Sequence, residues 1–400
     1  MFLKTSSARI VAIAGIVVIA LGFAYYAASH PMDFRVYHYG ARGVFDGSRP
    51  VYGRASGLGW PMHYRYPPLF LLLFAPFALL PLGFGAAVWL ILKALVLVLL
   101  VRAMLRRDHV VAGFSPRLLL IILIAPYIIE ELRYGNAQFF IFALAAVSLL
   151  IARKRPIASA ASLALAISIK VWPLFFVPYL AARREWKVVG YALVFTLLLT
   201  LLPSFYFGFH ANFNLLSQWF HQEFQTQLGE SEIWFPNQSL RGTLMRYLTV
   251  VDYSQVPDSN YPHVNIAALN PVFVRTIWLG IAGLAYAGLL VIAYRHRGRD
   301  EWLDHGLAFC LLILLEPFTQ KYALCVLLWP ALALGSALDE RPRLRILIYI
   351  AAGLALIQPL APGAGAQRLF QVLGLDFLSA ALLTAPVALL QARTRSGRIL

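Results

Sequence analysis

The sequence predicts an all-α polytopic membrane protein with about twelve crossings, and three observations carry that prediction. Hydrophobic residues fill 60% of the 400 positions, and charged residues fill only 13%, against about 25% in soluble proteins. The mean hydropathy is +0.71. The apolar residues form runs of membrane-spanning length, and basic clusters stand between many of them. A soluble enzyme, a disordered scaffold and a secreted disulfide-rich protein are therefore excluded.

The apolar runs define the expected crossings, since a membrane-spanning helix needs about 20 apolar residues, within a range of roughly 17 to 25. Seven runs approach or reach this length: 8–28, 84–105, 188–208, 272–294, 322–338, 344–360 and 372–391. Five shorter runs complete the count: 118–129, 139–151, 157–169, 171–181 and 302–315. We expect residues 1–400 to form a single integral membrane domain.

One apolar run, 69–80, does not fit this scheme, because it has only 12 residues and stands between prolines. Counting it as a crossing would place the next basic clusters outside, against the tendency of Lys and Arg to remain in the cytoplasm. We interpret it as a re-entrant or interfacial segment on the outer face.

The net charge of +16 is explained by topology. The basic clusters at 102–107, 153–155, 183–187, 295–299 and 341–345 lie beside apolar runs. The positive-inside rule assigns them to the cytoplasm, together with both termini of a multi-pass protein of the plasma (inner) membrane. No basic stripe with interleaved aromatic residues remains on the outer side, so nucleic-acid binding is not indicated.

Two long segments, 29–68 and 209–271, fall on the outer side and hold polar residues that point to chemistry. They greatly exceed the usual connection of about 4 to 6 residues, and loops of that size are functional or disordered. Their many aromatic residues favour ordered segments at the membrane surface, with interfacial helices in the second. The periplasm or exterior is thus the expected side of any active site.

Asp33 follows the first apolar run directly and is the strongest candidate for a catalytic group. A carboxylate at the outer interface is partly desolvated, which raises its proton affinity and suits it to act as a base. A solvated Asp capping a helix is the alternative interpretation of this position.

Six motifs occur in a fixed order along the chain: Asp33-Phe34-Arg35-Val36-Tyr37, Asp46-Gly47-Ser48-Arg49-Pro50-Val51-Tyr52, Tyr64-Arg65-Tyr66-Pro67-Pro68-Leu69-Phe70, Tyr134-Gly135-Asn136-Ala137-Gln138, Ser168-Ile169-Lys170-Val171-Trp172-Pro173-Leu174 and Asn237-Gln238-Ser239-Leu240-Arg241-Gly242. The set resembles the signature of glycosyltransferase family 87, the polyprenyl-phosphate-mannose-dependent α-1,2-mannosyltransferases of the GT-C superfamily. The resemblance covers the chain to about residue 335.

This resemblance implies a GT-C-type fold and transfer of a sugar, mannose in such enzymes, from a polyprenyl-phosphate donor. The acceptor is a hydroxyl of a lipid-linked or periplasmic glycan, and Asp33 takes the role of catalytic base in an inverting single displacement. The chain departs from the family pattern at Glu316-Pro317-Phe318-Thr319-Gln320-Lys321-Tyr322, where a Ser-Pro-x-Ser-Trp stretch with histidines is usual. The departure leaves the donor sugar open and places Lys321 where a histidine stands in other members.

Three cations are candidates for the donor phosphate: Lys170, Arg241 and Lys321. A lysine within the membrane costs about 2.5 to 3.5 kcal/mol on insertion scales, so Lys170 is expected to face a cavity or a charge partner. Snorkelling of its ammonium to the interface is the alternative. A guanidinium matches phosphate oxygens bidentately, but Arg241 is equally compatible with a salt bridge to Glu230 or Glu232.

Seven polar residues are candidates for binding the sugar or the acceptor: Tyr37, His63, Tyr66, Asn136, Gln138, Asn237 and Gln238. Their hydroxyl and amide groups can hydrogen-bond sugar hydroxyls. His63 ranks last, because a lone histidine in a tyrosine-rich loop is more often structural.

No motif for a metal or a cofactor is recognised. The sequence has no glycine-rich phosphate loop, no His or Cys pair at metal spacing and no nucleophile elbow, and Cys310 and Cys325 both lie in apolar runs. A polytopic lipid or glycan transporter or flippase is the alternative function. Transporters often contain two related halves, but no such repeat is found, and the polar residues gather on one side.

Overall fold

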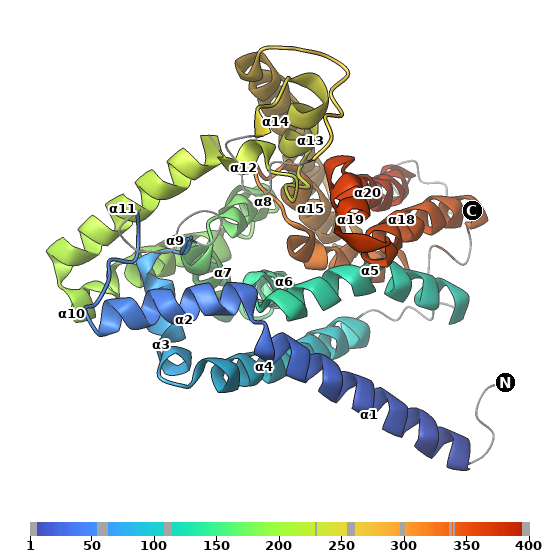
Figure 1. Ribbon diagram of the computed structural model, residues 1–400. Coiled ribbons are helices and arrows are strands. Elements are labelled where there is room, and N and C mark those ends of the chain that lie inside the picture. The colour runs from blue at the N-terminus through green and yellow to red at the C-terminus, as the bar shows by residue number, and fades with distance from the viewer. Residues whose placement is uncertain are drawn as a thin grey trace.

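A computed structural model describes residues 6–53, 63–107, 114–228, 230–253, 261–296, 301–335, 338 and 341–393. Within these ranges the regular structure is entirely helical (Figure 1). The first half contains α1 (Ser6–Ser29), α2 (Met32–Phe45), α3 (Pro68–Ala78), α4 (Leu82–Arg107), α5 (Phe114–Tyr134), α6 (Gln138–Ile151), α7 (Pro156–Ile169), η2 (Trp172–Phe175), α8 (Phe176–Ala182) and α9 (Trp186–Leu201). The second half contains α10 (Ser204–Phe207), α11 (Phe209–Leu228), α12 (Glu230–Ile233), α13 (Leu240–Leu248), α14 (Pro271–Arg295), α15 (Trp302–Leu315), η4 (Lys321–Leu327), α16 (Leu328–Leu334), α18 (Pro342–Leu360), α19 (Gly363–Val372) and α20 (Leu375–Arg393).

Four described segments are long and apolar enough to cross a bilayer: Leu82–Arg106, Trp186–Phe207, Pro271–Arg295 and Pro342–Leu360. Helices α19 and α20 pass the same test as a pair bent by 47°. Shorter apolar helices of 10–17 residues make up most of the remaining bundle. The chain is thus an all-α membrane protein, whereas the count of twelve crossings remains a prediction.

Three of the expected spanning helices are interrupted. The run 322–338 begins as the 3₁₀ helix η4, because Pro330 has no N–H to bond the carbonyl four residues earlier. The run 171–181 is likewise divided, into η2 and α8, with Pro173 near its start. The run 372–391 contains the bend between α19 and α20, where Gly374 has a φ of +73° that favours glycine.

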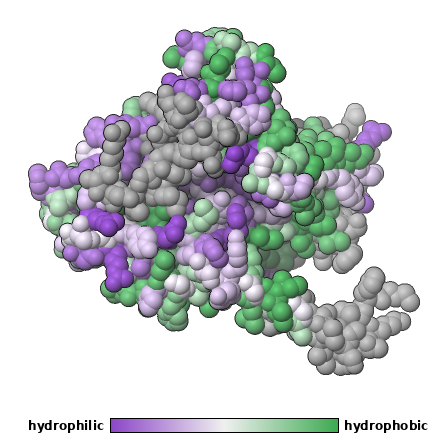
Figure 2. All heavy atoms as spheres, viewed as in Figure 1, coloured by the Kyte–Doolittle hydropathy of each residue, from purple (hydrophilic) through white to green (hydrophobic). Residues whose placement is uncertain are grey.

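The segments assigned to the outer side contain helices of their own. Helix α2 lies in the first, and α11, α12 and α13 lie in the second. Figure 2 shows hydrophilic residues gathered over α2, whereas hydrophobic residues cover the described part of α1. The interpreted re-entrant segment is α3, with 11 residues. Contact of these helices with a membrane surface remains a prediction.

Hydrogen bonds join the two outer segments. The amide of Gln222 on α11 donates to the carbonyl of Tyr64 over 2.7 Å and accepts from the backbone N–H of Gly53 over 3.0 Å. The indole of Trp219 donates to the carbonyl of Arg65 over 3.1 Å. Although more than 150 residues separate these partners, the hydrogen bonds join them into one continuous structure.

Candidate active site

The joined outer segments help to line a cavity of about 610 Å³, within the range of about 300 to 1,000 Å³ that is usual for ligand pockets. Its polar wall combines residues that are far apart in sequence: Asp33, Arg65, Tyr66, Asn136, Lys170, Glu223 and Glu316. Aromatic and aliphatic side chains of η2 and α14 line another part, among them Phe175, Trp278 and Tyr286. The cavity therefore has both a charged and an apolar region.

Asp33 faces this cavity from the first turn of α2. Its neighbours Phe34 and Tyr37 are buried against an aromatic cluster that includes Phe74, and this packing fixes the rotation of the helix. Burial raises the pKa of Asp33 to about 6, and a hydrogen bond from Asn136 and nearby cations offset that rise only in part. Asp33 thus faces the cavity and not bulk water.

Asn136 holds the carboxylate of Asp33 in position. Its side-chain nitrogen donates to Oδ2 of Asp33 over 2.7 Å. Its oxygen accepts from the backbone N–H of Gln138 over 2.8 Å and from the hydroxyl of Tyr66 over 3.3 Å. Because these two donors occupy the oxygen, the amide nitrogen must face Asp33. The hydroxyls of Tyr66 and Tyr37 are in turn 2.8 Å apart.

The backbone before Asn136 is tightly constrained. Gly135 has a φ of +68°, a conformation that side chains disfavour. An added Cβ there would lie 3.0 Å from the Cβ of Phe34. The indole of Trp89 also donates to the carbonyl of Gly135 over 3.0 Å. The glycine thus allows the α5–α6 connection to approach α2 closely enough for Asn136 to reach Asp33.

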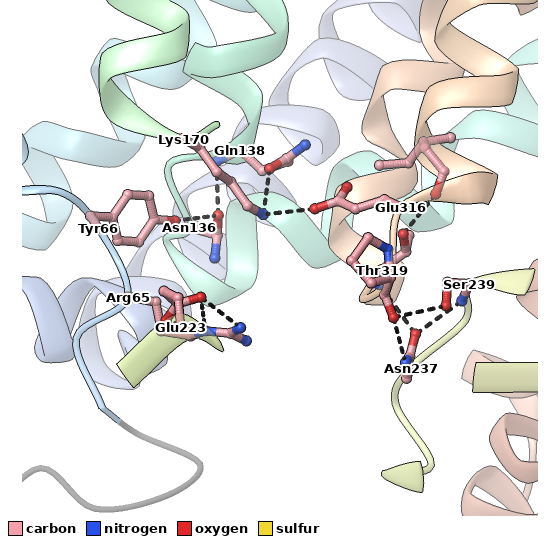
Figure 3. A network of polar contacts seen from close by, with 12 residues as sticks. Arg65, Tyr66, Asn136, Gln138, Lys170, Glu223, Asn237, Ser239, Glu316 and Thr319 are labelled. Carbon is pink, nitrogen blue, oxygen red and sulfur yellow. Dashed lines mark hydrogen bonds and ion pairs between the residues drawn. The ribbon is translucent and has the colours of Figure 1, made fainter. Parts of the chain in front are cut away.

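Lys170 directs its ammonium toward the cavity from the end of α7, where the backbone becomes extended. Its Nζ donates to Oε1 of Gln138 over 3.1 Å and lies 3.8 Å from Oε1 of Glu316 (Figure 3). The Lys170 side chain is still 30% exposed. Gln138 is buried and does not line the cavity; it contacts the site by accepting the hydrogen bond of Lys170.

Arg65 and Glu223 also line the cavity, although neither was a candidate from the sequence. Three hydrogen bonds of 2.9 to 3.2 Å join the guanidinium to both carboxylate oxygens. The guanidinium also lies 4.9 Å from the ring centre of Phe318. Arg65 belongs to one of the ordered motifs, so the sequence could have identified it as a candidate. Nothing in the sequence indicates its pairing with Glu223, which is 158 residues away.

The structure does not bring Arg241 and Lys321 to the cavity wall. Arg241 is buried, and its Nε lies 2.9 Å from Oε1 of Glu232, which also pairs with Arg275. Lys321 is buried with its Nζ 3.6 Å from Oδ1 of Asp376. Both cations have carboxylate partners of their own, as the salt-bridge interpretation of Arg241 expected.

Asn237 and Gln238 bind backbone and do not line the cavity. The Asn237 amide donates to the carbonyl of Pro317 over 3.1 Å and accepts from the N–H of Thr319 over 3.2 Å. The Gln238 amide donates to the carbonyl of Gln371 over 2.8 Å. The Asn237 amide thus holds the segment 316–320 in place (Figure 3), whereas the Gln238 amide binds the backbone of α19.

His63 lines the cavity, and burial lowers its pKa to about 4, so its imidazole is neutral near pH 7. Among the residues that the structure describes, no group of three or more His, Cys, Asp and Glu side chains is placed to hold a metal ion.

Comparison with known proteins identifies the family. Residues 64–315 match the model of glycosyltransferase family 87. The chain belongs to glycosyltransferase family 87. The match spans more than half of this glycosyltransferase and includes Arg65, Asn136 and Lys170. Glu316 is the residue directly after the matched range, and Asp33 lies 31 residues before its start. A search of curated proteins gave no match. The protein is thus a membrane glycosyltransferase, which acts on a sugar donor and an acceptor.

Proposed function

We propose that this family 87 enzyme transfers mannose from a polyprenyl-phosphate-linked donor to a hydroxyl of a lipid-linked or periplasmic glycan acceptor. The observation that carries the proposal is the placement of Asp33 and Lys170 on one cavity. A base and a cation in a single pocket match the two charge changes of glycosyl transfer, which are loss of the acceptor proton and departure of the phosphate.

Asp33 is the base. Its carboxylate accepts the proton of the acceptor hydroxyl while that oxygen forms a bond to the anomeric carbon. The bond from the anomeric carbon to the phosphate oxygen breaks, and its electron pair leaves with the phosphate. This single displacement inverts the configuration, so that a β-linked donor yields an α-linked product. A pKa of about 6 leaves Asp33 mostly ionised near pH 7 while retaining affinity for the proton.

The leaving phosphate is assigned to Lys170, with Arg65 as a second cation. Lys170 is less tightly engaged, because its nearest carboxylate oxygen is 3.8 Å away, whereas Glu223 holds Arg65 through three hydrogen bonds. A phosphate oxygen can therefore bind Lys170 without breaking a close ion pair. Arg241 and Lys321, each paired elsewhere, are assigned to supporting the cavity from behind.

The apolar part of the cavity suits the polyprenyl tail. Phe175 and Tyr286 contact each other edge to face, and Trp278 lies on the same lining. Helix α14, which carries Trp278 and Tyr286, is a candidate span with only 11% of its residues buried. A lipid substrate would enter from the bilayer beside this helix, with the charged region facing the periplasm or exterior and both termini in the cytoplasm.

The test is transfer by purified protein in detergent from labelled polyprenyl-phosphate-mannose, with Asp33→Asn as the variant. Turnover should fall by about 100- to 10,000-fold, the usual contribution of a general base, while donor binding remains. Asp46→Asn is the matched control, because Asp46 lies at the other end of α2 and is exposed. Near-normal turnover in Asp33→Asn would eliminate the proposed role.

Product analysis separates this proposal from a transporter or flippase. A carrier moves its substrate without forming a bond, so net formation of a glycosidic bond excludes it. Movement of intact donor across vesicles with no new glycoside would instead support the carrier.

A further inference from the structure

The segment 316–320 forms one wall of the cavity and is fixed by an unusual number of contacts. Besides the two bonds from Asn237, Gln238 donates its backbone N–H to the carbonyl of Thr319, and the Thr319 hydroxyl donates to the carbonyl of Ile313 over 2.7 Å. The hydroxyl of Ser239 adds a further bond to the carbonyl of Pro317 over 3.2 Å. The backbone of this wall is therefore fixed before any substrate arrives.

Glu316 is the charged side chain that this wall presents to the cavity. One carboxylate oxygen, Oε1, lies 3.8 Å from the ammonium of Lys170. The other, Oε2, is buried and has no hydrogen-bond partner among the residues that the structure describes. A buried carboxylate oxygen without a partner is costly, and its acceptor capacity points to a donor group that a ligand supplies.

We propose that Glu316 selects the sugar that is transferred, by accepting hydrogen bonds from its hydroxyls. This assignment rests on the proposed function, in which Lys170 binds the donor phosphate. The sugar is joined directly to that phosphate, so a residue beside Lys170 meets the donor sugar first. A carboxylate repels the phosphate itself and accepts from hydroxyls, and its two oxygens match two neighbouring hydroxyls.

The rigidity of the wall makes this contact selective. A glutamate on a mobile segment would follow a hydroxyl to a new position. Glu316 stands on a backbone that is held at Pro317 and Thr319, so it accepts only from hydroxyls within its reach. A site built to bond a hydroxyl strongly rejects an analogue that lacks it, because the acceptor is then left unpaired.

The experiment measures kcat/KM for polyprenyl-phosphate-mannose and for its 2-, 3-, 4- and 6-deoxy analogues, in the wild type and in Glu316→Ala. Wild type should use one or two deoxy donors about 10- to 150-fold less well than the parent, the range for a hydrogen bond to a charged group. In Glu316→Ala, kcat/KM for the parent donor should fall to the value for these deoxy donors, so that the variant no longer discriminates between them.

Two further variants control the result. Glu316→Gln keeps the size and one acceptor, so it should retain part of the discrimination. Glu185→Gln, at an ion pair with Arg153 outside the cavity, should discriminate as the wild type does. Thermal unfolding of each variant reports whether it is folded.

The outcomes separate the two proposals. If the wild type transfers the sugar but Glu316→Ala and Glu316→Gln keep its ratios between donors, Glu316 only orients Lys170 and the selective role is overturned. Equal use of all deoxy donors by the wild type overturns it as well. If the wild type does not use the parent donor, the proposed function fails, and the assignment of Glu316 fails with it.

Discussion

The two ends of α15 contain buried charges in different arrangements. At its start, Asp304 is 2.8 Å from Nη1 of Arg183, 2.7 Å from the amide of Gln391 and 3.2 Å from Nδ1 of His296. At its end, Glu316 reaches Lys170 only at 3.8 Å and has one oxygen without a hydrogen-bond partner among the described residues. Asp304 and Glu316 are 12 positions apart along this helix and its C-cap, so about 18 Å of helix separates the fully paired network from the loosely paired one.

The difference indicates which buried charges stabilise the protein and which bind a ligand. At the start of α15, where the charges join helices, both oxygens of Asp304 have a partner within 3.2 Å, because an uncompensated buried charge is costly. At the cavity, Lys170 and Glu316 are paired more loosely, since their charged atoms are 3.8 Å apart. The loose pairing leaves room for the groups that a substrate brings.

The largest expected effect is on stability, at the fully paired charges at the start of α15. Asp304→Ala removes the carboxylate from buried Arg183 and should lower the free energy of unfolding by about 3 to 5 kcal/mol, measured by denaturation in detergent. Asp33→Asn should instead leave stability unchanged or increase it, because the folded protein already disfavours the charged form of Asp33. Equal destabilisation by the two variants would contradict the distinction between charges that join helices and charges that face the cavity.

The next effect is at Lys170. Lys170→Ala should raise the donor KM by about 10- to 150-fold, since a charge-assisted hydrogen bond to phosphate is lost. Initial rates at varied donor concentration measure this change. Unchanged donor affinity together with unchanged turnover would remove Lys170 from the phosphate site.

Arg241→Ala tests the same distinction on a second cation, because Arg241 is paired with Glu232 and lies away from the cavity wall. We expect a loss of about 1 to 3 kcal/mol in the free energy of unfolding, as for a broken buried hydrogen bond, and little change in donor KM. Lys170→Ala is its matched comparison. A rise in KM as large as that of Lys170→Ala would return Arg241 to the donor phosphate.

The smallest effect is a shift in pH dependence. Asp33 is active when ionised, so kcat/KM should fall about tenfold per pH unit below a pKa of about 6. The stability contribution has the opposite sign: the raised pKa favours the protonated folded state, and that advantage is lost as pH rises through about 6.

Asn136→Ala tests the cause of this pKa. Its hydrogen bond favours the charged form of Asp33, so the variant should move the acid limb to higher pH. An unmoved limb in this variant would show that the observed pKa belongs to another group.

Local signals in the sequence were sufficient for the helical membrane class and for much of the site. The ordered motifs led to Asp33, Tyr37, Tyr66, Asn136 and Lys170, which the structure brings to one cavity. Each is marked by its own neighbours in the chain, such as a preceding apolar run or a break between two runs.

What the sequence did not predict depends on partners distant in the chain. The pairing of Arg65 with Glu223 requires α11 to lie across the first outer segment, which no local pattern specifies. Asn237 was expected to contact sugar because its amide suits hydroxyls, but the same amide also suits the backbone of the segment 316–320 that tertiary folding brings to it.

The hydrogen bonds that join Asn237 and Ser239 to the segment 316–320 have a consequence for protein engineering. An added Cβ at Gly242 would approach the Asn237 side chain to 2.6 Å, so the turn 237–242 tolerates little variation. A chimera that imports the cavity wall from another family member without its matching turn would lose the register between them. Exchange of sugar preference between enzymes of this kind therefore requires grafting both stretches as a unit.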